Sequence, residues 1–480
     1  MKLQMLIKDV SVISTDGDMS VEISGISYDS RRVKKGDVFV AMTGYETDGH
    51  KFIPDAIEAG AVAVICEREL DVGVATVVVP SSREALARMS CEWFGQPAEK
   101  MVFIGVTGTN GKTTTTYLIK HLLETCLGAK VGLVGTNKNM IGQQPIETER
   151  TTPESFELQK LFAEMLDAGC THVVMEVSSH ALYLHRVDGI KFKLGIFTNL
   201  SQDHLDFHKT MEEYLNAKAI LFNRCEMGII NLDDPHSQFL IENASCKVYT
   251  YSSAGKNEAD LVAKNINLKS NRVEFEAVHM DGISRTELHI PGMFNVSNAL
   301  AAESAALLLG ISLKNITDAM KTFEGVKGRM EVVPTGTDYT IIIDYAHTPD
   351  ALENILKCVR GFAEGRIVAV FGCGGDRDPK KRPIMGSIAE KLADKVIVTS
   401  DNPRTEKPEA IIEDILSGMK KKHKVIVDRV DAIHYAMDTA KKDDIILLCG
   451  KGHETYQIVG KTKHHMDERE IVLEHLKNSH

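Results

Sequence analysis

The sequence predicts an α/β protein of three domains, with two parallel sheets that carry helices on both faces. The chain has 480 residues, more than one hydrophobic core accommodates. Short apolar runs alternate with helical stretches over most of its length, as in doubly wound folds. Breaks at Gly95–Ala98 and Gly325–Met330 predict a smaller α/β domain over 1–98, a central doubly wound P-loop domain over 99–328 and a Rossmann-like domain over 329–480.

Each domain has its own predicted elements. Residues 1–98 place short strands around a helix near Phe52–Ala59. The stretch 246–290 predicts antiparallel hairpins, because Asn271 and Asp281-Gly282 mark turns, and an Ala- and Leu-rich helix follows from Gly292. The expected strands are Val38–Met42, Ala61–Cys66, Thr76–Val79, Met101–Ile104, Val131–Gly135, His172–Val177, Leu194–Asn199, Met227–Leu232, Thr340–Asp344, Ile367–Phe371, Val396–Ser400, Val425–Asp428 and Ile445–Cys449.

Composition argues against several classes of protein. The 56 basic and 67 acidic residues give a net charge of −11, which argues against nucleic acid or an anionic membrane surface as a partner. The nine cysteines are scattered without a Cys-x-x-Cys pair, as expected of buried reduced thiols rather than of disulfides or a zinc site. No apolar stretch predicts a signal peptide or membrane span, so we expect a cytoplasmic protein and, by default, a monomer.

The most informative segment is Gly105-Val-Thr-Gly-Thr-Asn-Gly-Lys-Thr-Thr-Thr-Thr116, directly after the first strand of the central domain. Glycines at a strand-to-helix turn let backbone N–H groups point at phosphate oxygens, and the helix N-terminus adds positive potential. Lys112 would reach the terminal phosphates and the Thr113 hydroxyl would bind Mg²⁺. Val106 stands where the common motif has its first glycine. A plain glycine-rich turn is the alternative, but the segment predicts an ATP site.

Two polar segments follow later strands of the central domain: Glu176-Val-Ser-Ser-His180 and Thr198-Asn-Leu-Ser-Gln-Asp-His-Leu-Asp206. The carboxyl ends of parallel strands share one edge of a sheet, so both segments are expected beside the phosphate loop. Glu176 and His204 are therefore candidate Mg²⁺ ligands. Taken singly, Glu176 could be a helix-capping or surface carboxylate, and His204 a histidine at a helix start.

Four polar turns follow strands of the C-terminal domain. A pocket rich in Arg, Asp and Glu suits a zwitterionic small molecule, because Arg pairs with carboxylate and Asp or Glu with ammonium. Any one turn could be structural, since Asp-Asn-Pro is a good turn sequence. The turns are Asp344–His347, Gly372–Asp378, Asp401–Arg404 and Gly450–Glu454.

Together these segments resemble the Mur ligase family, and within it the UDP-N-acetylmuramoyl-tripeptide synthetases (the MurE branch). The resemblance spans nearly the whole chain, and the glycine spacing of the phosphate loop is this family's own form. The motifs that carry it are Asp29-Ser-Arg31, Thr107-Gly-Thr-Asn-Gly-Lys-Thr-Thr114, Thr151-Thr-Pro153, Glu176–His180, Asp203–Asp206, Tyr214–Lys218, Asn295 with Asn298, Gly328-Arg-Met330 and Asp344–His347.

The resemblance implies an ATP- and Mg²⁺-dependent amide ligase of peptidoglycan precursor synthesis. In this family a substrate carboxylate takes the γ-phosphate of ATP, and an amine then displaces phosphate. Such chemistry needs positioning and charge neutralisation more than a protein nucleophile. Thr113 and Glu176 would hold one Mg²⁺, and His204 would help hold a second. The implied ATP-binding residues are Gly108, Thr109, Asn110, Gly111, Lys112, Thr113, Thr114, Asn295, Asn298, Arg329, Asp344 and His347.

Lys218 has two interpretations. From the residues alone it is an ordinary surface lysine on a helix expected over Tyr214–Phe222. In the family the matching lysine carries CO₂ as a carbamate, an anion that supports the second metal, whereas a free ammonium would repel Mg²⁺. The resemblance therefore adds Lys218 to the implied catalytic residues Lys112, Glu176 and His204.

The resemblance also implies where UDP-N-acetylmuramoyl-L-alanyl-D-glutamate binds. Residues 1–98 would hold its uridine end through Ser30, with ATP in the central domain and the amino acid in the C-terminal one. The sugar-peptide end would meet Thr151, Thr152, Ser178 and Arg186. Arg150 and Leu184 stand where some members have Asn and Gln, respectively.

The amino acid to be added is inferred from Asp401-Asn-Pro-Arg404. Family members that attach meso-diaminopimelate have this tetrapeptide, whereas members that attach lysine commonly lack its arginine. Lysine has no distal carboxylate and would leave buried guanidinium unpaired, at a cost on the order of several kcal/mol. The resemblance thus implies that meso-diaminopimelate is joined to the D-Glu γ-carboxylate. The implied contacts are Arg377 and Arg404 to its distal carboxylate, Gly450 and Glu454 to its distal ammonium, with Asp401, Asn402 and Pro403 completing the turn.

Other functions are possible on these residues. A lysine-adding ligase of the same branch, another Mur step and a folylpolyglutamate synthetase share the architecture; the Asp-Asn-Pro-Arg and Lys-Gly-His-Glu turns argue against the last two. A nucleotide-switch protein would use ATP to change shape and would need no second polar pocket. ATP turnover that requires an amino acid distinguishes a ligase from such a switch.

Overall fold

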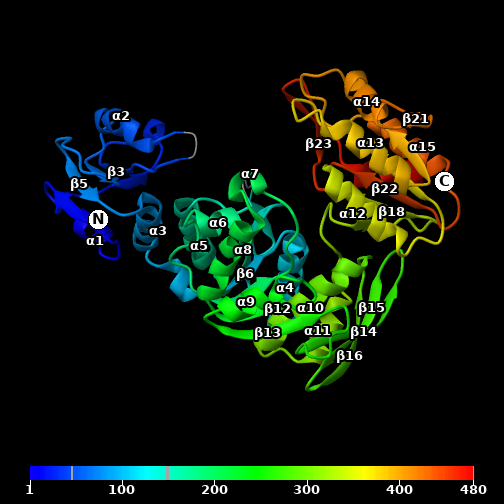
Figure 1. Cartoon of the computed structure of the whole chain (residues 1–480), viewed down its shortest axis with the longest axis horizontal. Coiled ribbons are helices and arrows are strands. Elements are labelled where there is room, and N and C mark those ends of the chain that lie inside the picture. Colours follow the sequence, from blue (N-terminus) through cyan, green and yellow to red (C-terminus); the bar gives the residue numbers. More distant parts are fainter. Residues whose placement is uncertain (45–46, 147–150, 479–480) are drawn as a thin grey trace. The chain divides into compact units, whose positions relative to one another are not determined.

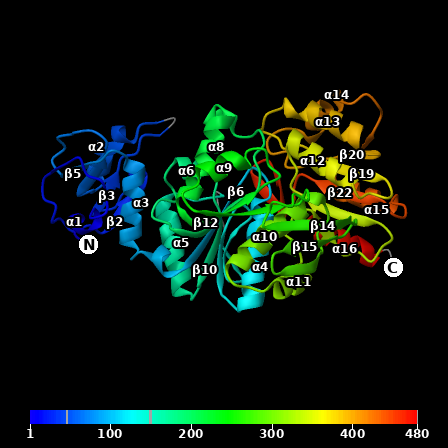
Figure 2. The ribbon, with the colours of Figure 1, turned by 60° about the horizontal axis from the view of Figure 1, so that its bottom comes forward.

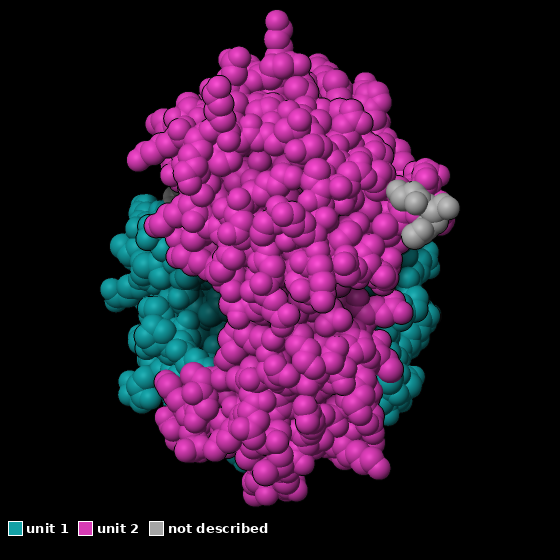
Figure 3. All heavy atoms as spheres, turned by 90° about the vertical axis from the view of Figure 1, so that its right-hand side faces the viewer, with its two compact units in different colours: residues 1–251, 304–309 teal, residues 252–303, 310–480 magenta. Residues whose placement is uncertain are grey.

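The computed structural model describes residues 1–44, 47–146 and 151–478. Helices and strands are mixed along the chain, which confirms the α/β class (Figure 1). The chain forms two compact units, residues 1–251 with 304–309 and residues 252–303 with 310–480 (Figure 3). Over the described ranges, no helix has the length and apolarity needed to cross a bilayer. The domain boundaries expected at 98 and 328 stay predictions.

The N-terminal segment forms a five-stranded sheet in the order β1-β5-β4-β3-β2, drawn in blue in Figure 2. β1 runs antiparallel to β5, and the other pairs are parallel. Side chains alternate between faces along β3, so Val38 packs with α3 and Phe39 with α2. The sequence did not reveal β1 and β2, because three-residue strands carry no periodicity. The elements are α1 (Leu3–Leu6), β1 (Ser14–Asp16), β2 (Gly25–Ser27), β3 (Asp37–Val40), α2 (Ile53–Glu58), β4 (Ala63–Cys66), β5 (Ala75–Val78) and α3 (Ser82–Trp93).

The parallel sheet of the same unit is built around β6 (Val102–Thr107), which lies between β10 (His172–Glu176) and β11 (Phe192–Phe197). Glu176 pairs with Val106, and Phe197 pairs with Thr107. The carboxyl ends of these strands therefore share one edge, as the sequence predicts. The other elements are α4 (Lys112–Leu127), β7 (Val131–Val134), β8 (Asn139–Ile141), β9 (Gln144–Ile146), α5 (Ser155–Asp167), α6 (Ser179–Tyr183), α7 (Leu205–His208), α8 (Met211–Ala219), β12 (Cys225–Asn231) and α9 (Ser237–Asn243).

The prediction of antiparallel hairpins over 246–290 is partly wrong. β14 (Leu261–Leu268), β15 (Val273–His279) and β16 (Gly282–Leu288) are antiparallel, with turns at the expected positions. The first strand, β13 (Lys247–Ser252), instead pairs parallel with β12. Hydrophobic periodicity reports which face of a strand is buried and not the direction of its partner, so the sequence could not separate the two arrangements.

The C-terminal sheet has the order β17-β18-β22-β19-β20-β21, in which only the pair β17–β18 is antiparallel. Alternate residues such as Ile367 and Val368 enter separate cores, so helices cover both faces. Asp344 and Phe371 both pair with Cys449, which places the turns after these strands at one edge, as predicted. The elements are α10 (Met293–Leu308), α11 (Leu313–Met320), β17 (Glu331–Val333), β18 (Thr340–Asp344), α12 (Pro349–Arg360), β19 (Ile367–Phe371), α13 (Lys381–Leu392), β20 (Lys395–Val398), α14 (Pro408–Ser417), β21 (Lys424–Val425), α15 (Arg429–Asp438), β22 (Ile445–Cys449), β23 (Tyr456–Val459), β24 (Thr462–His465) and α16 (Glu468–Asn478).

Glu303, in α10, is a buried carboxyl group with one hydrogen bond. Its Oε1 accepts from Thr286 Oγ1 at 2.7 Å, and its Oε2 accepts from no described residue. Burial raises the pKa of Glu303 to about 7. An unfolded glutamate has a pKa of about 4.3, so between these values the native state binds a proton that the unfolded chain does not. Stability is therefore lost as pH rises through this window.

We expect Glu303→Gln to remove this loss of stability, which amounts to about 4 kcal/mol above pH 7. The thermal midpoint of the variant should exceed that of the wild type at pH 8 and not at pH 5. Glu258→Gln, at an exposed position, is the control. Equal effects of the two substitutions at pH 8 would contradict the prediction.

Candidate active site

The phosphate loop joins β6 to α4. Gly108 has φ 148°, and a Cβ there would lie 1.9 Å from Thr198 Oγ1, so no larger residue fits. Thr198 Oγ1 in turn donates to Asn110 O at 2.6 Å, which ties the loop to the segment after β11. Lys112 Nζ donates to two loop carbonyl oxygens at 2.9 and 2.7 Å. The expected nucleotide residues from Gly108 to Thr114 thus all lie in this turn and at the start of α4.

Glu176 lies beside this loop and is 1% exposed. Its Oε1 accepts from Thr113 Oγ1 and from Thr136 N, both at 2.9 Å, and its Oε2 accepts from Thr136 Oγ1 at 2.9 Å. Glu176 ends a central strand, so the alternatives of a helix cap or surface carboxylate are wrong. Thr136 was missed by the sequence analysis, although it follows β7 and could have been found by the same rule of strand ends.

Thr113 and Glu176 fit a Mg²⁺ ion at this position. Magnesium in phosphate sites takes one or two protein oxygens and fills its remaining positions with phosphate and water. The hydrogen-bonded hydroxyl and carboxylate offer such a pair beside the phosphate loop. Within the described ranges, no group of three or more His, Cys, Asp or Glu side chains is arranged to hold a metal ion.

The residues expected at the sugar-peptide end contact the backbone of Glu176 or residues next to it. Thr152 Oγ1 donates to Glu176 O at 3.0 Å, and Arg186 Nη1 donates to Thr152 O at 3.2 Å. Ser178 caps α6 by accepting from Ala181 N, and Thr151 Oγ1 lies 3.0 Å from Thr136 Oγ1. Leu184 caps the other end of α6, whereas Arg150 lies outside the described residues. Ser30 lies in the N-terminal sheet region, at the start of the short helix Ser30–Arg32.

Lys218 is buried, so its interpretation as an ordinary surface lysine is wrong. It lies on α8 with 1% exposure, its Nζ 4.3 Å from the ring centroid of Tyr214, and it donates no hydrogen bond within the described part of the chain. Burial, reinforced by the ammonium of Lys112, lowers the pKa of Lys218 well below its usual value. Tyr214 Oη lies 3.2 Å from Thr109 Oγ1, which links this helix to the phosphate loop.

His204 lies on the loop that leads into α7. Its ring is 6.1 Å from that of Tyr214 and 4.9 Å from that of His180. The residue has φ 53°, a left-handed conformation that is uncommon outside glycine and is often found at functional sites. His204, Lys218 and the phosphate loop therefore share one side of the sheet edge. The sequence predicts this position for His204, whereas only the family resemblance implies it for Lys218.

The nucleotide residues expected in the second unit form two groups. Asn298 Nδ2 donates to Asn295 Oδ1 at 3.0 Å on α10. In the other group, Asp344 accepts from Met330 N and Ala346 N, both at 2.9 Å, and burial raises its pKa. The guanidinium of Arg329 lies 5.1 Å from the Tyr345 ring centroid, and His347 Nδ1 lies 2.9 Å from Tyr345 O.

The residues expected to bind the amino acid come together at the edge of the C-terminal sheet. Asn402 Nδ2 donates to Glu454 Oε2 at 2.8 Å, and Arg404 Nη1 donates to Gly375 O at 2.8 Å. A Cβ on Gly450 would lie 2.5 Å from Asp401 Oδ2. Pro403 and the exposed Arg377 complete the group. The hairpin β23–β24 supports this turn, since Arg404 N donates to Ile458 O at 3.1 Å.

Two fully buried cations beneath this pocket were missed by the sequence analysis. Lys451 Nζ donates to Asn402 Oδ1 at 3.1 Å and to Glu454 Oε2 at 3.2 Å. Arg429 pairs with Glu468 at 2.8 Å. Lysine and arginine are almost never fully buried unless paired, so these cations fix the groups they contact. The sequence signal for Lys451 was its position inside the polar turn Gly-Lys-Gly-His-Glu, which follows a strand.

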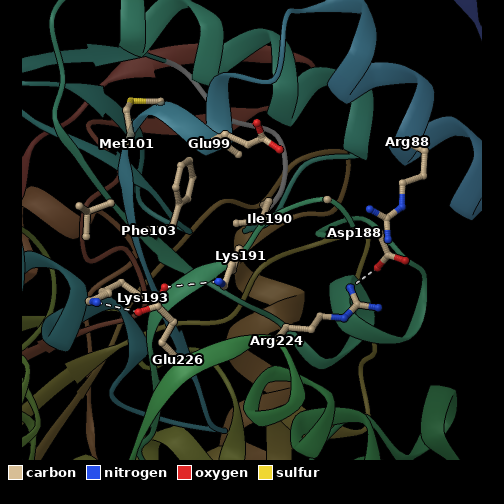
Figure 4. Close-up of a pocket in the computed structure, with 13 residues that line it drawn as sticks. Arg88, Glu99, Met101, Phe103, Asp188, Ile190, Lys191, Lys193, Arg224 and Glu226 are labelled. Atoms are coloured by element: carbon tan, nitrogen blue, oxygen red, sulfur yellow. Dashed lines mark hydrogen bonds and ion pairs between the residues drawn. The ribbon is translucent and has the colours of Figure 1, made fainter. Parts of the chain in front are cut away.

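A separate cavity of about 570 Å³ lies at the amino ends of the central strands (Figure 4). Five of its charged groups pair with each other: Asp188 with Arg224, and Glu226 with Lys193 at 2.6 Å and Lys191 at 3.6 Å. The phosphate loop follows the opposite end of β6. This cavity is therefore distinct from the site built around Glu176.

Comparison with known proteins identifies the family. The model of the Mur ligase middle domain matches residues 106–306, that of the Mur ligase glutamate ligase domain 328–452, and that of the Mur ligase family catalytic domain 22–92. The UDP-N-acetylmuramoyl-L-alanyl-D-glutamate–2,6-diaminopimelate ligase 1 of Clostridium acetobutylicum is 49% identical over 482 residues, which are 99% of each chain. The chain belongs to the Mur ligase family.

Solved structures agree with this assignment. A UDP-N-acetylmuramoyl-L-alanyl-D-glutamate–2,6-diaminopimelate ligase is 35% identical to this Mur ligase, with a TM-score of 0.76 over 100% of this chain and 99% of the other. Folylpolyglutamate synthase of Mycobacterium tuberculosis shares the fold at a TM-score of 0.62 and 16% identity, over 83% of this chain and 94% of the other. The second likeness concerns the fold alone.

The phosphate loop of this Mur ligase gives a direct prediction. Gly108→Ala should lower affinity for ATP by about tenfold or more, because the new methyl group would displace Thr198 and the loop. Gly73→Ala is the matched control, since Gly73 also has a positive φ but nothing within 4 Å of its Cβ position. Calorimetric titration with a non-hydrolysable ATP analogue measures both. Equal affinities in the two variants would exclude the steric role of Gly108.

Proposed function

We propose that this Mur ligase joins meso-2,6-diaminopimelate to the D-Glu γ-carboxylate of UDP-N-acetylmuramoyl-L-alanyl-D-glutamate, with ATP converted to ADP and phosphate. The observation that carries the proposal is the group of side chains brought together at the C-terminal sheet edge. There Arg377 and Arg404 flank Gly374, and Glu454 lies on the adjoining turn with Asn402. Guanidinium and carboxylate groups together match the carboxylate and ammonium at the distal end of diaminopimelate. Relatives near half identity carry that activity in their names.

In the first step, an oxygen of the substrate carboxylate attacks the γ-phosphorus, and the bond from that phosphorus to ADP breaks. Lys112 and the loop N–H groups would hold the phosphates, while Thr113 and Glu176 would hold Mg²⁺. When bound, Mg²⁺ supplies charge neutralisation at the β- and γ-phosphates. Asn295, Asn298, Arg329, Asp344 and His347 would serve the rest of the nucleotide.

In the second step, the amine of diaminopimelate attacks the activated carbonyl carbon, the carbon–oxygen bond to phosphate breaks, and the nitrogen loses a proton. The carboxylate substrate would be held by Thr151, Thr152, Ser178 and Arg186, which lie close to Glu176 in the structure. Ser30 would contact its uridine end. The role of these protein groups is orientation, which converts a bimolecular step into one between fixed partners.

Lys218 is proposed to carry a carbamate. Its neutral amine would add to CO₂, forming a nitrogen–carbon bond and releasing one proton, and the resulting anion would help His204 hold a second Mg²⁺. Burial and the lowered pKa support this proposal, because the neutral amine is the form that reacts with CO₂. The amine makes no hydrogen bond to a described residue that the modification would have to break.

The three-domain division is also part of the proposal. The family-model matches end at residue 92 and begin again at 106, and later end at 306 and begin at 328, which supports boundaries near 98 and 328. All nine cysteines are free thiols, which supports a cytoplasmic location.

Phosphate release by the purified protein tests the proposed function. With ATP, Mg²⁺ and the UDP-linked dipeptide, we expect turnover on addition of meso-diaminopimelate and little with L-lysine, which lacks the carboxylate that Arg404 would bind. Turnover with lysine alone would overturn the assignment of the pocket. Silence with both would point to another ligase step, and release without any amino acid to a nucleotide switch.

The carbamate has its own test. Enzyme equilibrated with ¹³C-bicarbonate should show a carbamate carbon resonance at neutral pH, and Lys218→Met should lose both that resonance and more than about 99% of kcat. Lys120→Met is the control, because Lys120 is also buried but pairs with Glu124 at 2.6 Å. Unchanged turnover in Lys218→Met would show that the lysine has no catalytic part.

A further inference from the structure

Arg382 is a buried cation near, but outside, the amino-acid pocket. It lies in the first turn of α13, and its side chain is 3% exposed. Nη1 donates to Glu406 Oε2 at 2.9 Å and Nη2 donates to Glu406 Oε1 at 2.8 Å. Nη1 also donates to Asp414 Oδ2 at 2.8 Å. The guanidinium therefore spans both oxygens of Glu406, a geometry that fixes the direction as well as the distance of the carboxylate.

Glu406 connects Arg382 to the turns that carry Arg377 and Arg404. It stands two residues after Arg404, and its Oε1 accepts from Asp376 N at 2.6 Å. Asp376 immediately precedes Arg377. A second tie joins the same turns, since Thr405 Oγ1 donates to Asp376 Oδ1 at 2.6 Å. The positions of both pocket arginines thus depend on a carboxylate that Arg382 holds.

The two turns are packed without spare room. A Cβ on Gly375 would lie 1.9 Å from Pro403 O, and Gly375 N donates to Asn402 O at 2.9 Å. A Cβ on Gly374 would lie 2.9 Å from Arg404 Nη1 and 3.9 Å from Arg377 Cγ. Because both arginine side chains flank one glycine, a shift of either turn changes the spacing of the two guanidinium groups.

The backbone at these turns also needs support. Asp376 and Arg404 have φ 54° and 51°, in the left-handed region that non-glycine residues rarely adopt. Such conformations persist where neighbouring contacts hold them. Asp376 is bonded to Glu406 and Thr405, in the turn beside Arg382, and its backbone oxygen also accepts from Arg377 Nη1 at 3.1 Å.

We propose that Arg382 is a positioning residue that sets the spacing of Arg377 and Arg404, and through it the preference for an amino acid with a distal carboxylate. It contacts neither of the two arginine side chains among the described interactions. It acts through Glu406 and through Gly374 O, which accepts from Arg382 Nη2 at 3.4 Å. The inference rests on the proposed function, since that function assigns the two arginines to the distal carboxylate of diaminopimelate. Lysine lacks this group, so its binding does not depend on the spacing.

Arg382→Lys tests the proposal, because lysine keeps the charge but cannot span both oxygens of Glu406. We expect KM for meso-diaminopimelate to rise on the order of tenfold to a hundredfold. KM for ATP and kcat at saturating amino acid should change by less than about twofold. This is the result expected when a substitution weakens binding of the amino acid equally in the ground state and in the transition state. The ratio of kcat/KM for diaminopimelate to that for L-lysine should fall by the same factor as KM rises.

Arg366→Lys is the matched control. Arg366 makes a comparable multidentate pair with the buried Asp444, but at the amino end of β19, away from the pocket. Both substitutions should lower the thermal midpoint, and only Arg382→Lys should change KM for diaminopimelate. Glu406→Gln, whose side chain is 33% exposed, provides a second variant if Arg382→Lys does not fold, with the same expected rise in KM.

The outcomes separate the inference from the proposed function. Wild-type turnover with diaminopimelate, together with equal KM values in Arg382→Lys, Glu406→Gln and Arg366→Lys, would overturn the positioning role alone. Wild-type turnover with lysine and not with diaminopimelate would overturn the proposed function and this inference together. A selective rise in KM would establish the positioning role.

Discussion

The pairing of β6 with β10 and β11 is the constraint on which the site of the first unit depends. Hydrogen bonds between these parallel strands set Glu176 opposite Val106 and Phe197 opposite Thr107. A slip of one residue would turn Glu176 to the other face of the sheet, away from Thr113 and Thr136. The same logic applies to the second unit, where Asp344 and Phe371 share Cys449 as their partner. Each group of polar turns exists because strand ends are aligned.

Buried cations provide a second constraint on the site residues. The buried arginines and Lys218 differ in how they offset the cost of desolvating a charge. Arg382 and Arg429 keep their charge, because carboxylate and carbonyl oxygens accept from the guanidinium, although Arg382 Nε donates to no described atom. Lys451 is likewise satisfied, by an amide oxygen and a carboxylate. Lys218 has no such acceptor among the described residues, and its burial lowers its pKa. A neutral lysine amine can react as a nucleophile, whereas a paired arginine holds the groups around it in place.

Much of the fold could be predicted from the sequence, because long apolar strands ending in polar turns carry a strong signal. Strands at Thr340–Asp344, Ile367–Phe371 and Ile445–Cys449 are confirmed to the residue. The direction of β13 was predicted wrongly, and the hairpin β23–β24 was not predicted, since neither follows from local periodicity. At the site, the phosphate loop and Glu176 could be found from strand ends. The burial of Lys218 and the pairing of Arg382 with Glu406 could not, because both depend on contacts between distant helices and loops.

The hairpin β23–β24 has a consequence for the order in which this protein becomes competent. Ile458 accepts from Arg404 N and donates to Asn402 Oδ1. The turn that carries Arg404 therefore gains its support from chain that is translated more than fifty residues later. The phosphate loop, near residue 110, is complete long before that point of synthesis. A chain interrupted ahead of Tyr456 would contain the phosphate loop but would lack the hairpin that supports the turn of Arg404. During translation, the residues that bind nucleotide are therefore made before the residues that support selection of the amino acid.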